Sequence, residues 1–247
     1  EINLEYADQE AALRNLITNF PTSGEDFFKG DRNVLKTFRL DNGKVVNVKS
    51  FRRPNIVNRI VYKYFRQPKA SRSFHHSRKL LERGILVPKP VAFFENFDSY
   101  SIADSYFISE QIYPDVHFRK LLLNPEDPRY EEVVRHFAGL AHYMHENGIE
   151  FKDFSPGNVL IMERGGRYDF YLVDLNRMDF HEKMSLEKRL KNFERLPPDE
   201  RLMRIISDEY ARIAGKPFEL IYKGIAGFVR SFRKKFELRR KIKFWKR

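Results

Sequence analysis

The sequence predicts an α+β fold with two lobes, a small antiparallel-sheet lobe with one helix over residues 1–110 and a mainly helical lobe over residues 111–247. Two alternating segments before residue 51 are joined by a tight-turn signal, which is typical of a β-hairpin. Apolar residues recur with a helical period in residues 69–83 and again in residues 131–147. A loop rich in chemically active side chains follows the second of these helices.

The first predicted element is a hairpin. Residues 34–40 alternate, Asp41-Asn42-Gly43 supplies the turn, and residues 45–51 return as the paired strand. Lys49 lies in this otherwise apolar second strand. A lysine there either faces solvent or extends a point charge toward the phosphates of a nucleotide.

The rest of the first lobe continues with a helix and two strands. Residues 69–83 are expected to form a helix, because Gly84 follows the last apolar position and suits a helix end. Two prolines then favour an extended entry into a strand over residues 91–94. A further strand is expected over residues 106–112.

The second lobe begins with a helix over residues 131–147 that stops at Gly148. His142 and His145 lie one turn apart on this helix. They are either ordinary helix-face residues or two ligands of a metal site with no evident third ligand.

The chemically informative segment follows this helix. Asp153 is followed five residues later by Asn158, then by a predicted strand over residues 159–161 and a Gly-Gly turn. A second predicted strand, residues 171–173, leads directly into Asp174. The hairpin would bring the three polar side chains to one end.

This arrangement suits phosphoryl transfer. The reaction needs hard oxygen ligands for Mg²⁺ and one carboxylate beside the attacking hydroxyl. Asp153 fits the carboxylate beside the nucleophile, and Asn158 and Asp174 fit the metal ligands. The alternative is that Asp153 and Asn158 are only turn or cap residues around Pro156-Gly157, which the downstream Asp174 makes less favourable.

Composition limits the remaining possibilities. The 247 residues include no cysteine, which excludes disulfides, thiolate metal sites and cysteine nucleophiles. No apolar run reaches the roughly 18 residues that a membrane span needs, and no signal sequence opens the chain. A soluble or peripheral cytosolic protein is therefore expected.

The positive charge is concentrated at the C-terminal end. The chain carries a net charge of +12, and residues 223–247 hold eleven Lys/Arg against the single acid Glu237. Aromatic and aliphatic residues recur there at three- and four-residue steps, which predicts a basic amphipathic helix. The helix would lie on an anionic membrane surface or pack its apolar stripe on the domain. Nucleic-acid binding is not expected, because the rest of the chain shows no basic face and no nucleic-acid motif.

The order of these elements resembles the protein-kinase-like fold, and more closely the lipopolysaccharide core sugar kinases, the Kdo and heptose kinase family. The resemblance spans roughly residues 28–180. The segments that carry it are Val48-Lys49-Ser50-Phe51, Ser71-Arg72-Ser73-Phe74, Arg83-Gly84-Ile85-Leu86-Val87-Pro88-Lys89-Pro90, His145-Glu146-Asn147-Gly148-Ile149, and Val173-Asp174-Leu175-Asn176-Arg177, together with Asp153 and Asn158.

The resemblance implies ATP- and Mg²⁺-dependent phosphorylation of a sugar hydroxyl, most simply of Kdo, on the lipid A inner core at the cytoplasmic face of the inner membrane. Asp153 would be the catalytic base, and Asn158 and Asp174 would be the Mg²⁺ ligands. Lys49 would contact the phosphates and Gly30 would belong to the phosphate-covering loop. The backbone from Glu110 to Ile112 would form the hinge that pairs with adenine.

The chain also departs from the wider kinase pattern. Gly30 stands where protein kinases have three glycines, and His76 stands where a Glu would pair with Lys49. Phe151 replaces the usual His two residues before the base. Leu175-Asn176 follows Asp174 where protein kinases have Phe-Gly, and the sequence has no A-P-E-type segment. These last two departures argue against a protein kinase with a phosphorylated activation loop.

Two further alternatives follow from the same residues. One is a phosphotransferase for another small molecule or for a protein. The other is a catalytically silent kinase-like module that binds a membrane or a partner. Four basic residues are candidates for contact with an anionic glycan, and their spacing does not select among them: Arg119, Lys120, Arg177 and Lys183.

Overall fold

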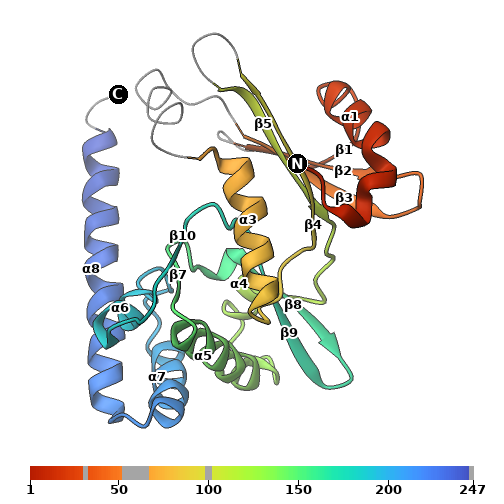
Figure 1. Ribbon diagram of the computed structural model, residues 1–247. Helices are drawn as coiled ribbons and strands as arrows, with labels where there is room; N and C mark the ends of the chain where they lie inside the picture. Colours follow the sequence, from red (N-terminus) through yellow and green to blue (C-terminus); the bar gives the residue numbers. More distant parts are fainter. Residues whose placement is uncertain (30–32, 52–66, 98–101, 245–247) are drawn as a thin grey trace. The chain divides into compact units, whose positions relative to one another are not determined.

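The computed structural model describes residues 1–29, 33–51, 67–97 and 102–244. The chain divides into two compact units, Glu1–Tyr113 and Pro114–Arg247 (Figure 1). The boundary between the two units falls three residues after the lobe boundary expected from the sequence.

The first unit is built on a five-stranded antiparallel sheet in the order β1-β2-β3-β5-β4. Its strands are β1 (Glu25–Lys29), β2 (Asn33–Arg39), β3 (Val45–Phe51), β4 (Pro90–Phe97) and β5 (Ile102–Glu110). The predicted hairpin is confirmed, with Arg39 paired to Val45 across the turn. Gly43 adopts a φ of +80°, a left-handed conformation that glycine accepts without steric cost.

The strand expected over residues 106–112 lies earlier, at Ile102–Glu110. Its partner β3 begins at Val45, so the Gln111 N–H donates to the Val45 carbonyl and the ladder has no further partner. The strand therefore ends at Glu110, and the prediction that it reaches Ile112 was wrong.

One face of this sheet is covered by N-terminal helices that the sequence reasoning did not identify. A 3₁₀ helix, η1 (Leu4–Gln9), leads into α1 (Glu10–Thr18), drawn in red beside the sheet in Figure 1. Their buried side chains pack with those of β3, β4 and β5. This core contains Tyr6, Leu13, Leu16, Phe20, Val46, Val48, Ala92 and Ile108.

The other face of the sheet packs against α3 (Lys69–Glu82), where the helix was expected. The Phe74 ring on α3 lies 5.3 Å from the ring of Phe93 on β4. Phe93 pairs with Phe107 on β5, which in turn pairs with Lys49 on β3. Because directly paired residues share a face, Lys49 lies on the α3 face of the sheet.

The second unit contains α4 (Phe118–Leu121), α5 (Tyr130–Glu146), α6 (Leu186–Lys191), α7 (Glu200–Ala214) and α8 (Phe218–Phe244). Two small antiparallel sheets accompany these helices. One pairs β7 (Ile149–Phe151) with β10 (Met178–Phe180), and the other has the order β6 (Val116–His117), β8 (Val159–Arg164), β9 (Arg167–Leu172). The expected helix over 131–147 and the expected Gly-Gly hairpin are both present.

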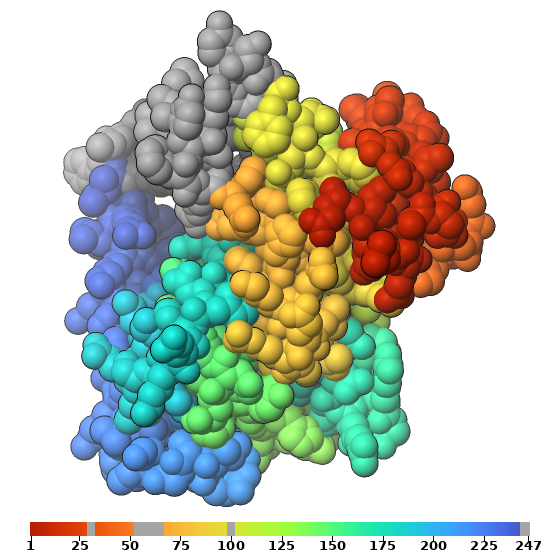
Figure 2. Space-filling model, in the orientation of Figure 1, coloured from red at the N-terminus to blue at the C-terminus, as the bar shows by residue number. Residues whose placement is uncertain are grey.

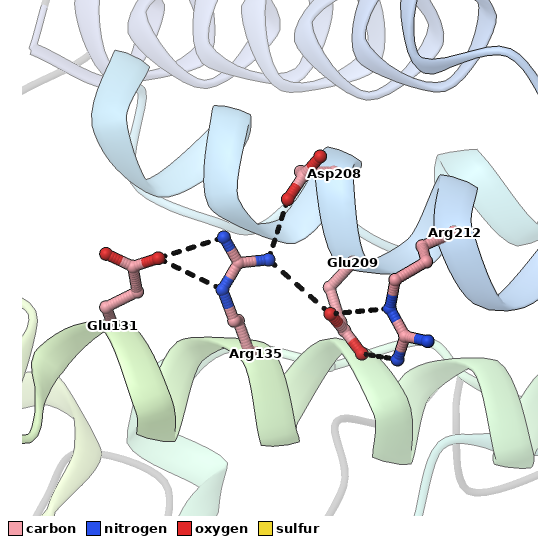
Figure 3. Close-up of polar contacts among 5 residues, drawn as sticks. All are labelled: Glu131, Arg135, Asp208, Glu209 and Arg212. Carbon is pink, nitrogen blue, oxygen red and sulfur yellow. Dashed lines mark hydrogen bonds and ion pairs between the residues drawn. The ribbon is translucent and has the colours of Figure 1, made fainter.

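Helices α5 and α7 are joined at the surface by a network of charges (Figure 3). Arg135 on α5 bonds to Glu131 one turn away and to Asp208 on α7, at 2.9 and 2.7 Å. Glu209 links this arginine to Arg212. Ion pairs at the surface each contribute about 0.2–1 kcal/mol, so this network adds only modestly to the stability of the unit.

Helix α8 changes character along its length. Ile221, Ile225, Ala226 and Val229 are almost completely buried, and Gly224 allows close approach to Leu190 on α6. Beyond Phe232 every side chain described is exposed, including Phe236 (51%) and Ile242 (48%). The helix therefore packs on the unit through one face of its first half, and its second half exposes basic and apolar side chains to solvent. Figure 2 shows this helix (blue) at the surface. Within the described residues, no helix is both long and apolar enough to cross a bilayer.

Candidate active site

Asp153 lies in a loop whose backbone is fixed by the buried residues on either side. Phe151 and Phe154 have no exposed surface, and the Phe154 N–H donates to the Phe151 carbonyl at 3.0 Å. The Phe154 ring stacks 4.8 Å from Phe137 on α5. The Asp153 side chain between them is 18% exposed. Burial of the two phenylalanines thus holds the carboxylate at the surface of the unit.

The side chain of Asn192 also holds this loop in place. The Asn192 amide donates to the Phe151 carbonyl at 2.8 Å and bonds to Nε2 of the buried His145 at 3.1 Å. The other ring nitrogen of His145 lies 2.9 Å from the Tyr210 hydroxyl. Burial lowers the pKa of His145 to about 3, so the ring is neutral. With both ring nitrogens bonded to protein groups, His145 supports the loop and is not available as a metal ligand.

Asn158 and Asp174 meet at the end of the β8–β9 hairpin. Val159 pairs with Leu172, and the Val173 N–H donates to the Asn158 carbonyl at 3.0 Å. The Asn158 side-chain NH₂ donates to the Asp153 carbonyl at 2.8 Å. The three predicted residues are therefore brought to one end of the hairpin, as the spacing indicated.

Asp174 has an unusual backbone conformation. Its φ of +61° is the only positive value for a non-glycine residue in the part of the chain that is described. A left-handed L-residue costs about 1–2 kcal/mol, although aspartate tolerates it better than most. The carboxylate also accepts a hydrogen bond from the Asn176 amide at 2.5 Å. Strain of this kind is concentrated at functional sites, which supports a role for this carboxylate.

Two arginines contact Asp153. Arg177 and Arg195 each place a guanidinium nitrogen 3.0 Å from the same carboxylate oxygen, Oδ1. Arg177 was one of four candidates for an anionic ligand, whereas Arg195 was missed. Arg195 lies in a loop 42 residues after Asp153, and no motif in the sequence connects the two.

The predicted nucleotide-binding residues lie in the first unit. Lys49 lies on the central strand β3, with Nζ 5.3 Å from the Phe51 ring centroid. The Glu110 carboxylate bonds to the Tyr6 hydroxyl and to Lys44, and burial together with the bond to Glu110 raises the pKa of Tyr6 to about 12. The Glu110 side chain therefore ties η1 to the sheet, so any role in adenine binding falls to its backbone.

The backbone around Ile112 is partly committed to other contacts. The N–H groups of Glu110 and Gln111 donate to Lys89 and Val45, and the Ile112 carbonyl accepts from the Gln111 side chain. The Ile112 N–H makes no hydrogen bond within the described residues. Gly30 lies outside the described residues.

The first unit has a five-stranded sheet with a helix on the face that carries a lysine. The second unit is helical, with an Asp-Asn loop and a hairpin ending in Asp, and together these features are those of the kinase-like fold. Comparison with solved structures agrees. The structure of WaaP in complex with acyl carrier protein matches with a TM-score of 0.65 and 16% identity, covering 96% of each chain.

Two more distant kinases also align. The Rio2 kinase of Chaetomium thermophilum in its ADP/Mg²⁺-phosphoaspartate complex gives a TM-score of 0.49 at 15% identity, covering 93% of this chain and 77% of the other. The MAP kinase LmaMPK10 of Leishmania major gives 0.43 at 17% identity, covering 87% and 66%.

The family is given by the sequence itself. The model of the lipopolysaccharide kinase (Kdo/WaaP) family matches residues 41–211, more than half of the chain. The chain belongs to this family, which makes it a kinase of lipopolysaccharide biosynthesis and implies ATP as the phosphoryl donor. No curated protein matches the chain.

Proposed function

We propose that this chain transfers the γ-phosphoryl group of ATP to a hydroxyl of Kdo on the lipid A inner core. The observation that carries the proposal is the meeting of Asp153, Asn158 and Asp174 at one end of the β8–β9 hairpin in a member of the lipopolysaccharide kinase family. In this proposal Asp153 accepts the proton of the attacking hydroxyl.

Asn158 and Asp174 suit a magnesium ion. The Asn158 NH₂ is used by the Asp153 carbonyl, which leaves its amide oxygen as the atom for a cation. An amide oxygen and a carboxylate are the hard donors that Mg²⁺ prefers. A bound ion would neutralise charge on the phosphates, and these two side chains would orient it.

The first unit would hold the nucleotide. Lys49 is a compact cation on a rigid central strand and suits contact with the α- and β-phosphates. The Ile112 N–H, which has no partner among the described residues, is a donor suited to adenine. Glu110 would contribute its backbone carbonyl on the same side of the purine, while its side chain stays with Tyr6 and Lys44.

We further propose that the protein works at the inner face of the inner membrane, where its glycolipid acceptor lies. Residues 233–242 of α8 hold six Lys/Arg and one acid, with Phe236, Leu238 and Ile242 exposed among them. Apolar insertion and attraction to anionic headgroups act together on such a helix. The anionic surface would be contacted by this second half, because the apolar face of the first half, with Ile221, Ile225 and Val229, is buried in the unit.

The function is tested with purified protein, ATP, Mg²⁺ and either Kdo-lipid A or lipid A without Kdo. Mass spectrometry of the products is expected to show one added phosphate on the Kdo of Kdo-lipid A and no added phosphate on lipid A without Kdo. Phosphorylation of both acceptors would exclude Kdo as the site. Absence of transfer together with no Mg²⁺-dependent thermal shift by ATP would favour a catalytically silent module.

The membrane proposal is tested by a cut after Phe232, since a cut at residue 223 would remove the buried Ile225 and Val229. The shortened chain is expected to keep its unfolding temperature and to lose salt-sensitive binding to anionic vesicles. A full-length variant with Phe236→Ser and Ile242→Ser keeps every charge and is expected to bind more weakly. Unchanged vesicle binding by the shortened chain would contradict the proposal that the second half of α8 binds the membrane.

A further inference from the structure

The carboxylate of Asp153 is surrounded by more positive charge than it can neutralise. Arg177 and Arg195 both bond to its Oδ1 at 3.0 Å, and Arg177 also lies 3.4 Å from Oδ2. Neither arginine makes an ion pair with another carboxylate of the described residues. A third guanidinium, that of Arg119, lies against the same loop, where a Cβ on Gly157 would be 3.3 Å from its Nη2.

The two arginines that contact Asp153 differ in how they are held. Arg195 donates through Nε to the Lys152 carbonyl at 2.8 Å, and its guanidinium lies 5.0 Å from the centre of the Phe232 ring on α8. A guanidinium over an aromatic face is stabilised as a cation and fixed in orientation. Among the residues that the structure describes, none gives Arg177 such support, and its side chain is 48% exposed, against 29% for Arg195. One guanidinium is thus fixed and the other can move toward a ligand.

A base that must accept a hydroxyl proton cannot keep both ion pairs unchanged. When the acceptor hydroxyl approaches Asp153, one or both guanidiniums must release part of their bonding to this carboxylate. A guanidinium presents a planar fork of donors that matches a carboxylate or a phosphate group. An acceptor with an anionic group beside its reactive hydroxyl would replace the bonds that Asp153 gives up.

We propose that Arg177 and Arg195 form an anion-binding subsite that holds a carboxylate or phosphate group of the acceptor next to the hydroxyl presented to Asp153. This inference rests on the proposed function and adds the specificity of its acceptor side. It selects Arg177 from the four basic candidates in the sequence and adds Arg195, which Phe232 orients. All of these residues belong to the second unit, so the subsite is complete within it.

The experiment measures kcat/KM for three acceptors: Kdo-lipid A, its analogue with the sugar carboxyl converted to carboxamide, and its analogue with the lipid A phosphates removed. The proteins are wild type, Arg177→Gln and Arg195→Gln. Arg164→Gln is the matched control. Arg164 lies at the turn of the β8–β9 hairpin, at the opposite end from Asn158 and Asp174, and its only ion pair among the described residues is a long one of 3.7 Å to Asp169. The KM for ATP is measured for each protein.

Each subsite variant is expected to lose about 10- to 100-fold in kcat/KM toward Kdo-lipid A, the range for losing a charge-assisted hydrogen bond. If the subsite binds the sugar carboxylate, the variants and wild type should have equal kcat/KM for the carboxamide analogue. If it binds a lipid phosphate, they should have equal kcat/KM for the dephosphorylated analogue. The KM for ATP should stay unchanged, and the Arg164→Gln control should match wild type. Arg177→Lys, which keeps the charge without the fork, should recover only part of the loss.

Equal losses with all three acceptors would overturn the proposal, because arginines that merely position Asp153 would affect every acceptor alike. No loss with any acceptor would overturn it as well. If wild type phosphorylates none of the acceptors, the proposed function fails, and the subsite is then judged by calorimetric binding of a Kdo methyl glycoside. Binding that the double variant Arg177→Gln/Arg195→Gln abolishes would support the subsite, and binding equal to wild type would refute it.

Discussion

Gly148 connects α5 to β7 and thereby sets the path of the chain into the Asp153 loop. Its φ is +67°, and a Cβ at this position would lie 1.8 Å from the His181 backbone carbonyl oxygen. The Gly148 carbonyl also accepts a hydrogen bond from the His181 N–H at 2.8 Å. Gly148→Ala therefore cannot be absorbed by a side-chain movement and must shift β10 away from β7.

The cost has two parts. The left-handed conformation costs an alanine about 1–2 kcal/mol, and the displaced hydrogen bond adds about 0.5–1.5 kcal/mol. The expected loss is therefore about 1.5–3.5 kcal/mol, a large part of the roughly 5–15 kcal/mol that stabilises a typical native protein. Gly215→Ala is the matched control, because Gly215 has a φ of +60° and no atom of the described residues lies within 4 Å of its added Cβ.

Urea unfolding of wild type, Gly148→Ala and Gly215→Ala measures both costs under the same conditions. Gly215→Ala should lose only the conformational part, and Gly148→Ala should lose about 0.5–1.5 kcal/mol more, the contribution of the broken hydrogen bond. Gly148→Ala should also lower kcat if Asp153 is the base proposed above, because β7 leads directly into the Asp153 loop. Equal destabilisation by the two substitutions would refute the packing described between Gly148 and His181.

Three other predictions concern the support and ligands of the site. Burial lowers the pKa of His145 to about 3 from 6.5, so between these pH values the unfolded chain binds a proton that the folded chain does not, and the free energy of unfolding falls as the pH drops. Wild type should lose about 2 kcal/mol of stability from this group between pH 7 and pH 5. A His145→Gln variant whose stability changes with pH as steeply as that of wild type would contradict this. Asp174→Asn should raise the Mg²⁺ concentration needed for half-maximal rate by at least about tenfold, the loss expected for one charged contact, and an unchanged Mg²⁺ dependence would exclude this carboxylate as a ligand. Lys49→Met should reduce the thermal shift that ATP produces and leave the stability of the unliganded protein within about 0.5 kcal/mol, whereas an equal shift would show that Lys49 does not contact the nucleotide.

Local patterns predicted the elements whose stability is local. The hairpin of β2 and β3 and the end of α3 at Gly84 follow from turn and cap chemistry that a few neighbouring residues determine. The convergence of Asn158 and Asp174 followed from the length of the β8–β9 hairpin. These features did not require knowledge of any distant contact.

Features that depend on distant contacts were missed. Leu13, Leu16 and Phe20 have the spacing of a buried helix face, but the sequence was interpreted from the later hairpin and α1 was overlooked. Arg195 reaches Asp153 only because α6 and the loop after it fold back onto the Asp153 loop. Helix α8 has one continuous basic and apolar pattern, and only packing on α6 and α7 separates its buried half from its exposed half.

The central claim is that Asp153 is the base of a sugar kinase, and the rate of phosphate transfer to Kdo-lipid A by Asp153→Asn tests it most directly. Asp169→Asn is the matched control, because it removes a carboxylate from β9 near the turn of the β8–β9 hairpin, at the end away from Asp153. Removing a general base typically costs about 10²–10⁴-fold in rate, so Asp153→Asn should lose at least 100-fold in kcat while binding ATP and unfolding like wild type, and the control should keep its rate. An Asp153→Asn enzyme that transfers phosphate at the wild-type rate would contradict the account.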